Sequence, residues 1–171
     1  FSFPRNSISF SRFTNFSNIQ NGYFRLSRPS DLPANFKSPK LLNDQSYPII
    51  IINGHYQPQL SIIPNGLSIF SGSDDFKSNP HSYDIDSNKP HSSKMKNPFY
   101  LLNTSLMNSG LSFEISENIQ IEKPIEIFFC TSEIDEPIMN HPRFHFRFRK
   151  NSKATIIEHY RGQTKESYFI N

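Results

Sequence analysis

Residues 47–58 read Tyr47-Pro-Ile-Ile-Ile-Ile-Asn53-Gly54-His-Tyr-Gln-Pro58, and this stretch does most to indicate the type of fold. The four consecutive isoleucines favour a β-strand, because β-branched side chains pack well on a pleated sheet. Asn53-Gly54 supplies the two positive φ angles that a type I′ turn requires, and a second short run follows it. The stretch therefore predicts a β-hairpin. A second Asn-Gly pair, Asn65-Gly66, lies between two further apolar runs.

The sequence after residue 110 is a succession of short apolar runs separated by polar and proline-containing segments. These runs are Leu111–Ile115, Ile119–Ile121, Ile125–Cys130, Phe144–Arg149, Ala154–Tyr160 and Tyr168–Ile170. Short strands at this spacing fit a sandwich, a barrel or a β-solenoid. The last run reaches the end of the sequence, so we expect the sheet to continue in a longer protein.

Three parts can be distinguished along the chain. Residues 1–70 combine an irregular arm, rich in Pro, Ser and Asn with scattered Phe, and the hairpin region. Residues 71–97 form a polar connection rich in Ser, Asp, Asn, Lys and Pro. Residues 98–171 begin with a short helix over 98–109 and continue into the strands. Pro98 suits the first turn of that helix, and Gly110 is expected to end it.

The composition excludes some classes of protein. The chain has 171 residues and a net charge of +3, which is too small to imply nucleic-acid binding by itself. The single cysteine, Cys130, excludes an internal disulfide framework and a four-cysteine metal site. No apolar run is longer than Ile49–Ile52, whereas a membrane span needs about 20 residues. We therefore expect no membrane association.

The segment 143–149, Arg-Phe-His-Phe-Arg-Phe-Arg, has the sharpest local pattern in the sequence. On a strand its phenylalanines share one face, because successive side chains point to opposite sides of a sheet. The other face is formed by Arg143, His145, Arg147 and Arg149. One interpretation is a strand with one buried and one solvated face. The other is a basic stripe for nucleic acid or an acidic partner, although nearby carboxylates and the absence of a wider basic run argue against nucleic acid.

The remaining titratable candidates do not form a recognisable site. His141 and His145 cannot share one ion on a strand, where four residues span about 13 Å. Glu158 and His159 are adjacent and would face opposite sides of a strand. Cys130 has the character of a small buried hydrophobe. The sequence also lacks a glycine-rich phosphate loop and a Gly-x-Ser-x-Gly motif. We therefore assign no catalytic, cofactor-binding or metal-binding residue and expect no enzyme activity.

Several segments in the same order resemble one known family, the SufD-type subunits of the SUF iron–sulfur cluster assembly system. Ile52–Ser61 is similar to the family hairpin vNGxfxPxLS, and Pro98–Leu106 resembles its FxxLNTAL segment, with Ser105 in place of the usual Ala. Further similar segments are Gly110 with the following strand, Ile119–Ile127, His141–Arg143 and Asn151–Tyr160. The resemblance covers residues 47–171. The polar connection at 71–97 departs from the helical stretch that the family leads us to expect.

The resemblance implies a fold and a role. The expected fold is mainly β, an N-terminal arm and hairpin region followed by the first coils of a right-handed parallel β-helix. The chain would then be the N-terminal portion of a non-catalytic scaffold subunit, working with SufB-like and SufC-like (ATPase) subunits. The iron–sulfur cluster is the product of that complex, and this chain alone would bind no cofactor. The implied location is the cytoplasm or, alternatively, a plastid.

Other interpretations remain open. The chain could be a SufB-like paralogue, since SufB shares the β-helix, although the Asn-Gly hairpin followed by Pro-x-Leu-Ser favours SufD. It could also be a β-solenoid binding module that uses the basic face of 143–149. A carbohydrate-active β-helix enzyme would need clustered carboxylates on one sheet face, and the sequence offers no such cluster. Pairing of two copies through β-helix edges is a further option, because unpaired strand edges need to be covered.

Overall fold

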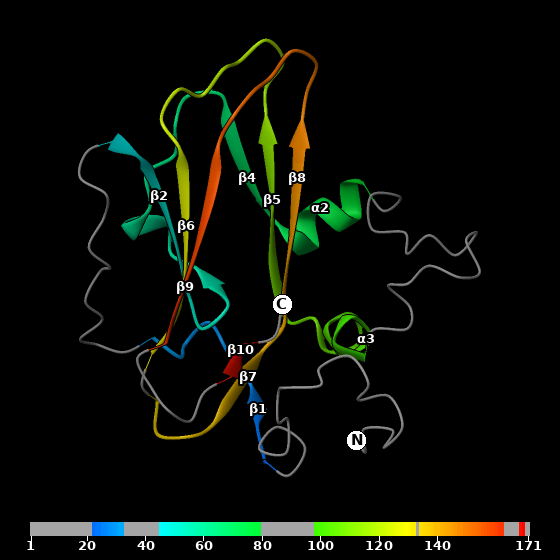
Figure 1. Cartoon of the computed structure of the whole chain (residues 1–171). Coiled ribbons are helices and arrows are strands. Elements are labelled where there is room, and N and C mark those ends of the chain that lie inside the picture. The colour runs from blue at the N-terminus through cyan, green and yellow to red at the C-terminus, as the bar shows by residue number, and fades with distance from the viewer. Residues whose placement is uncertain (1–21, 33–44, 80–97, 133, 163–167, 170–171) are drawn as a thin grey trace.

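The computed structural model describes residues 22–32, 45–79, 98–132, 134–162 and 168–169, and the protein is mainly β (Figure 1). The strands in this part of the chain are β1 (Arg25–Leu26), β2 (Tyr47–Ile52), β3 (His55–Tyr56), β4 (Leu67–Ser71), β5 (Ser109–Ile115), β6 (Ile125–Thr131), β7 (Ile138–Asn140), β8 (Pro142–Phe148), β9 (Ile156–Gly162) and β10 (Tyr168–Phe169). The α-helices are α2 (Gly72–Ser78) and α3 (Pro98–Leu106), and Pro58–Leu60 forms a 3-10 turn.

Within the described residues, the strands form three sheets that the chain visits in a repeated order. The sheet orders are β1-β7-β10, β3-β2-β6-β9 and β4-β5-β8. The chain passes through β5, β6 and β7 and then through β8, β9 and β10, and each later strand pairs in parallel with the corresponding earlier one. Paired residues lie 33 positions apart in β5–β8 (Ser109 and Pro142), 31 in β6–β9 (Ile125 and Ile156) and 29 in β7–β10 (Met139 and Tyr168).

Strands from the beginning of the chain share these sheets. β1 pairs in parallel with β7, and β2 pairs in parallel with β6 along its whole length. β4 is antiparallel to β5. The hairpin region and the strands after residue 98 therefore lie in common sheets.

The core lies between the sheets, and β2 and β6 are buried on both faces. Ile49, Ile51, Ile127 and Phe129 belong to the main hydrophobic cluster, together with residues of β4 and β5. Their neighbours on the opposite face form a second buried cluster, Ile50, Ile52, Phe128 and Cys130. A strand buried on both faces reads as a continuous apolar run, which explains the four isoleucines.

The hairpin predicted at 47–58 is confirmed. β2 and β3 are antiparallel, and Asn53 and Gly54 have φ angles of 50° and 84°. The Asn53 side chain is fully buried. Its amide nitrogen donates to the Asp31 carbonyl (2.7 Å) and to Ser132 Oγ (2.6 Å), and its carbonyl oxygen accepts from the Ser132 backbone N–H (3.0 Å). The turn therefore also links the sheets to the arm.

The helix predicted at 98–109 is present, but its end differs from the prediction. α3 ends at Leu106, and Gly110 lies inside β5 instead of ending the helix. The reason is a close backbone approach. A Cβ atom at position 110 would lie 2.2 Å from the Arg143 carbonyl oxygen on β8, so the pairing of these strands requires glycine here.

The first residues of the segment 71–97, interpreted from the sequence as a polar connection, contain a helix that was not predicted. Gly72–Ser78 forms α2, and the Ser71 hydroxyl accepts a hydrogen bond from the Asp74 backbone N–H (3.2 Å) as its N-cap. Residues 80–97 lie outside the described residues.

The predicted strand at Ile119–Ile121 is reduced to an isolated bridge between Gln120 and Lys153. The short strands β1 and β7 were not predicted. Of the N-terminal arm, residues 1–21 lie outside the described residues. Among the described residues, no helix has the length and apolar character needed to cross a bilayer.

Candidate functional site

The basic face of β8 is engaged by the chain's own carboxylates. The Arg147 guanidinium forms a bidentate ion pair with Asp75 of α2 and also contacts Glu114 of β5 (3.3 Å). Asp75 is nearly completely buried, with 2% of its side chain exposed, and its Oδ2 accepts a hydrogen bond from the Ser112 hydroxyl (2.5 Å). Arg147 therefore fixes α2 onto the outer face of the β4–β5–β8 sheet.

The other basic residues of this stripe have similar roles. One guanidinium nitrogen of Arg143 donates to Asn103 (3.1 Å) and Thr104 (2.6 Å), both on α3. Arg149 donates to Glu114 (2.9 Å), and these hydrogen bonds from Arg149 and Arg147 hold the pKa of that carboxyl below its usual range. His145 is half-buried, and burial lowers its pKa. The stripe thus attaches two helices to the sheet.

His141 and Cys130 occupy buried positions. His141 is fully buried between β7 and β8, and neither of its ring nitrogens has a hydrogen-bond partner among the described residues. Burial therefore lowers its pKa. Cys130 is 4% exposed, and burial raises the pKa of its thiol despite the opposing charge of Arg161. Neither residue has the surroundings of a reactive group.

Glu158 and His159 point to opposite sides of β9, as predicted. Glu158 accepts a hydrogen bond from the Tyr160 hydroxyl (2.9 Å), whereas His159 stacks on Phe128 of the neighbouring strand (4.6 Å between ring centroids). The His159 Nε2 atom lies 3.6 Å from Oε2 of Glu126, a fully buried carboxylate with no other partner among the described residues. Sequence reasoning did not find Glu126, because only the parallel register brings these residues together.

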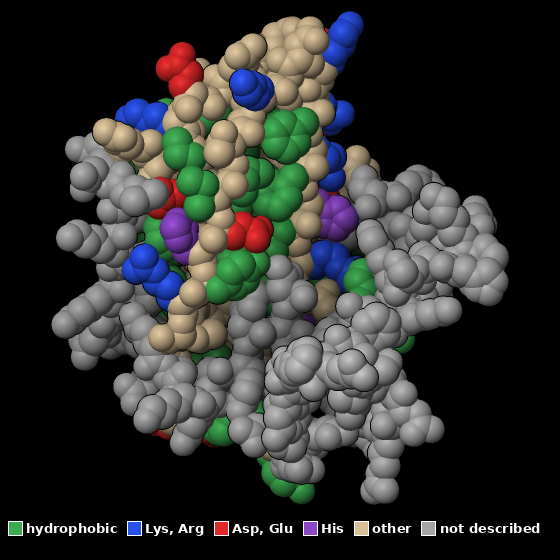
Figure 2. All heavy atoms as spheres, viewed as in Figure 1, with side chains coloured by type: hydrophobic (Ala, Val, Ile, Leu, Met, Phe, Trp, Pro, Cys, Tyr) green, Lys and Arg blue, Asp and Glu red, His purple; other side chains and the backbone are tan. Residues whose placement is uncertain are grey.

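β8, β9 and β10 expose one edge each. Each is the last strand of its sheet, and within the described residues nothing pairs with its outer side. The core-facing aromatic residues are partly exposed here, with 36% of Phe146, 46% of Phe148 and 53% of Tyr160 accessible. Phe146 stacks on Phe113 of the preceding strand and Tyr160 on Phe129, at centroid distances of 4.9 and 4.7 Å. Figure 2 shows hydrophobic side chains gathered over β8 and β9.

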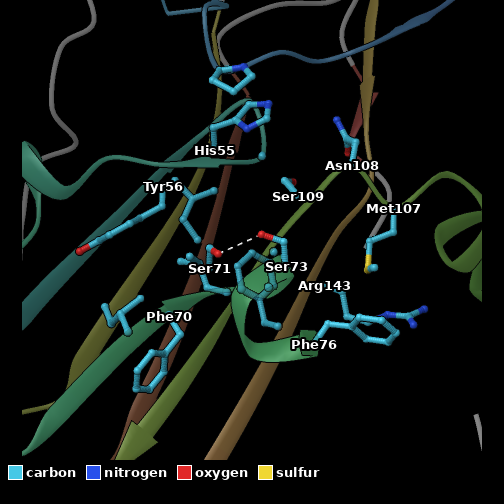
Figure 3. Close-up of a pocket in the computed structure, with 18 of the residues that line it drawn as sticks. His55, Tyr56, Phe70, Ser71, Ser73, Phe76, Met107, Asn108, Ser109 and Arg143 are labelled. Atoms are coloured by element: carbon cyan, nitrogen blue, oxygen red, sulfur yellow. Dashed lines mark hydrogen bonds between the residues drawn. The ribbon is translucent and has the colours of Figure 1, made fainter. Parts of the chain in front are cut away.

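A cavity of about 700 Å³ lies where the β2–β3 hairpin, β4, α2 and the beginning of β5 meet (Figure 3). Its apolar lining includes Ile51, Tyr56, Ile69, Phe70, Phe76, Met107, Leu111 and Phe144. Its polar lining includes His55, Ser71, Ser73, Lys77, Asn108, Ser109 and Arg143. Sequence reasoning did not find this cavity, because these residues come from four stretches that are far apart in the chain, 51–56, 69–77, 107–111 and 143–144.

Within the described residues, no group of three or more His, Cys, Asp or Glu side chains is arranged to hold a metal ion. No protein-family model matches the sequence, and a comparison with curated proteins finds no significant match. By their geometry, the exposed strand edges and the cavity are the candidate functional regions.

Proposed function

We propose that this chain is the N-terminal portion of a SufD-type scaffold subunit. The observation that carries the proposal is the repeated parallel pairing of β5–β8, β6–β9 and β7–β10, with partners 33, 31 and 29 residues apart. Coils of a parallel β-helix would return the chain to the same sheets at nearly constant intervals, so this repeated pairing supports the proposal. Four of the family segments quoted above lie within this repeating part of the chain, namely Gly110 with the following strand, Ile119–Ile127, His141–Arg143 and Asn151–Tyr160, whereas Ile52–Ser61 and Pro98–Leu106 precede it.

The exposed edges support a scaffold role. An unpaired strand edge with accessible aromatic side chains is a template for pairing with another strand, and natural proteins usually cover it. We propose that further coils of the same fold continue from β8, β9 and β10, and that the assembled β-helix presents its surfaces to SufB-like and SufC-like subunits. No step of the cluster chemistry is assigned to the residues of this chain, and its proposed location is the cytoplasm.

The engaged basic face weakens the alternative of a nucleic-acid-binding module. A protein that reads phosphates needs arginines free to contact them. Here Arg147 is paired with Asp75 and Glu114, Arg149 with Glu114, and Arg143 with α3. Binding of a DNA or RNA duplex with a steep salt dependence would restore that alternative.

Co-purification tests the proposal directly. The protein containing this chain is co-expressed with SufB-type and SufC-type subunits, and a tag on this chain is used for capture. We expect the three subunits to elute together, and iron and sulfide to be substoichiometric in this chain purified alone. Failure to retain either subunit would overturn the assignment, and stoichiometric iron and sulfide in the isolated chain would overturn its non-catalytic role.

A further inference from the structure

The cavity next to the β2–β3 hairpin has the dimensions of a small-molecule site. Sites for small ligands measure roughly 300–1,000 Å³ and have mostly apolar walls with a few polar groups. This cavity measures about 700 Å³. Its deep wall is formed by core residues of three sheet strands, Ile51, Leu111 and Phe144. Phe70 and Met107, 43% and 44% exposed, also line it, so large apolar side chains extend from the core to the solvent.

The charged residues of the lining are positive. Lys77 and Arg143 line the cavity, whereas none of the described lining residues is an aspartate or a glutamate. Arg143 hydrogen-bonds to the neutral side chains of Asn103 and Thr104, and within the described residues it pairs with no carboxylate. Lys77 has one long contact with Asp74 (3.7 Å) among the described residues, and both side chains are mostly exposed. The apolar walls are therefore bordered by two cations that can still balance an anion.

Buried polar groups without partners lie at the hairpin side of the cavity. The hydroxyl of Ser109, a lining residue, and both polar atoms of the fully buried Asn140 side chain have no hydrogen-bond partner in the described part of the chain. These groups lie together behind Gly54, since a Cβ atom at Gly54 would be 3.1 Å from Ser109 Oγ and 3.0 Å from Asn140 Cβ. Unsatisfied buried polar groups cost stability, and of these two residues only Ser109 belongs to the lining of the cavity.

We propose that this cavity binds a small amphipathic carboxylate. The apolar body of the ligand would lie against Ile51, Leu111 and Phe144. Its carboxylate would accept a hydrogen bond at the polar side of the cavity, and Arg143 and Lys77 would balance its charge. The proposal is independent of the scaffold role, because all the described lining residues belong to this chain.

An NMR titration of the chain with decanoate tests the proposal. The backbone amides of Gly54, Gly72 and Gly110 report on the cavity, and Gly66, at the opposite end of β4, is the internal control. We expect saturable shifts at the first three amides and none at Gly66. Acetate, which lacks the apolar body, and decyltrimethylammonium, which reverses the charge, should bind at least tenfold more weakly. Absent or unsaturable shifts, shifts that include Gly66, or equal binding of the cation would overturn the proposal.

Two variants, each with a matched control, test whether the lining residues contribute to the affinity for decanoate. Lys77→Glu should weaken decanoate binding about thirtyfold, because it changes the local charge by two units and each unit charge at about 4 Å in water is worth about fivefold. Lys150→Glu, at the exposed turn after β8, makes the same charge change away from the cavity and should leave the affinity unchanged. Phe70→Ala should weaken binding at least threefold, whereas Phe148→Ala, at the far end of β8, should not. Equal effects within either pair would refute this location.

Discussion

The Arg147–Asp75 ion pair provides the sharpest test of how the fold is held together. We expect Arg147→Met to lower the free energy of unfolding by about 3–5 kcal/mol, because it leaves a buried carboxylate without its bidentate cation. The side chain of Asp75 is 2% exposed, so water cannot replace the guanidinium. Asp75→Asn should cost less, about 1–3 kcal/mol, because Arg147 keeps its contact with Glu114 (3.3 Å) and is itself 20% exposed. The asymmetry follows from the different exposure of the two partners.

Urea unfolding at pH 7, followed by circular dichroism, measures these differences. The double variant Asp75→Asn/Arg147→Met should be more stable than Arg147→Met alone, since it removes the unpaired charge. Arg149→Met is the matched control, because the side chain of Arg149 is 58% exposed and its pair with Glu114 should contribute no more than about 1 kcal/mol. The reasoning would be refuted if Arg147→Met cost no more than Asp75→Asn or than Arg149→Met.

Three further predictions concern single positions in or between the strands. Burial lowers the pKa of His141 below 6.5, so the unfolded state binds the proton first and the free energy of unfolding should fall as the pH drops below about 6.5. His141→Leu should reduce the slope of this fall, measured by urea unfolding, by at most about 1.4 kcal/mol per pH unit. An unchanged slope would contradict this prediction. Gly110→Ala should lower the free energy of unfolding by at least about 1–3 kcal/mol in the same assay, because the new Cβ atom would lie 2.2 Å from the Arg143 carbonyl oxygen. A variant as stable as the wild type would rule out that clash. Cys130, 4% exposed and with its pKa raised by burial, should react with a thiol reagent only after unfolding, and fast labelling of the folded protein would show that the site opens.

The local elements could be predicted because their signals are local. The Asn53-Gly54 turn requires two positive φ angles in adjacent residues, and the structure has them at 50° and 84°. The alternation of Arg and Phe over 143–149 correctly predicted a strand, but not one buried and one solvated face, because Phe146 and Phe148 are 36% and 46% exposed at the sheet edge whereas the Arg147 side chain is 20% exposed. The prediction failed where a local signal had another cause: Gly110 was assigned to a helix end, whereas its role is a close contact with β8.

By itself, the sequence therefore determined that the chain is rich in short strands, where its main hairpin lies, and which side chains share a face of β8. Only the tertiary structure decided what those side chains contact. Parallel pairing brings Glu126 to His159 across 33 positions, and the packing of α2 brings Asp75 to Arg147 across 72. The cavity likewise exists only where the hairpin, β4, α2 and β5 meet. The physical reason is range: strand and turn preferences arise between neighbouring residues, whereas ion pairs, buried polar groups and cavities arise between segments far apart in the chain.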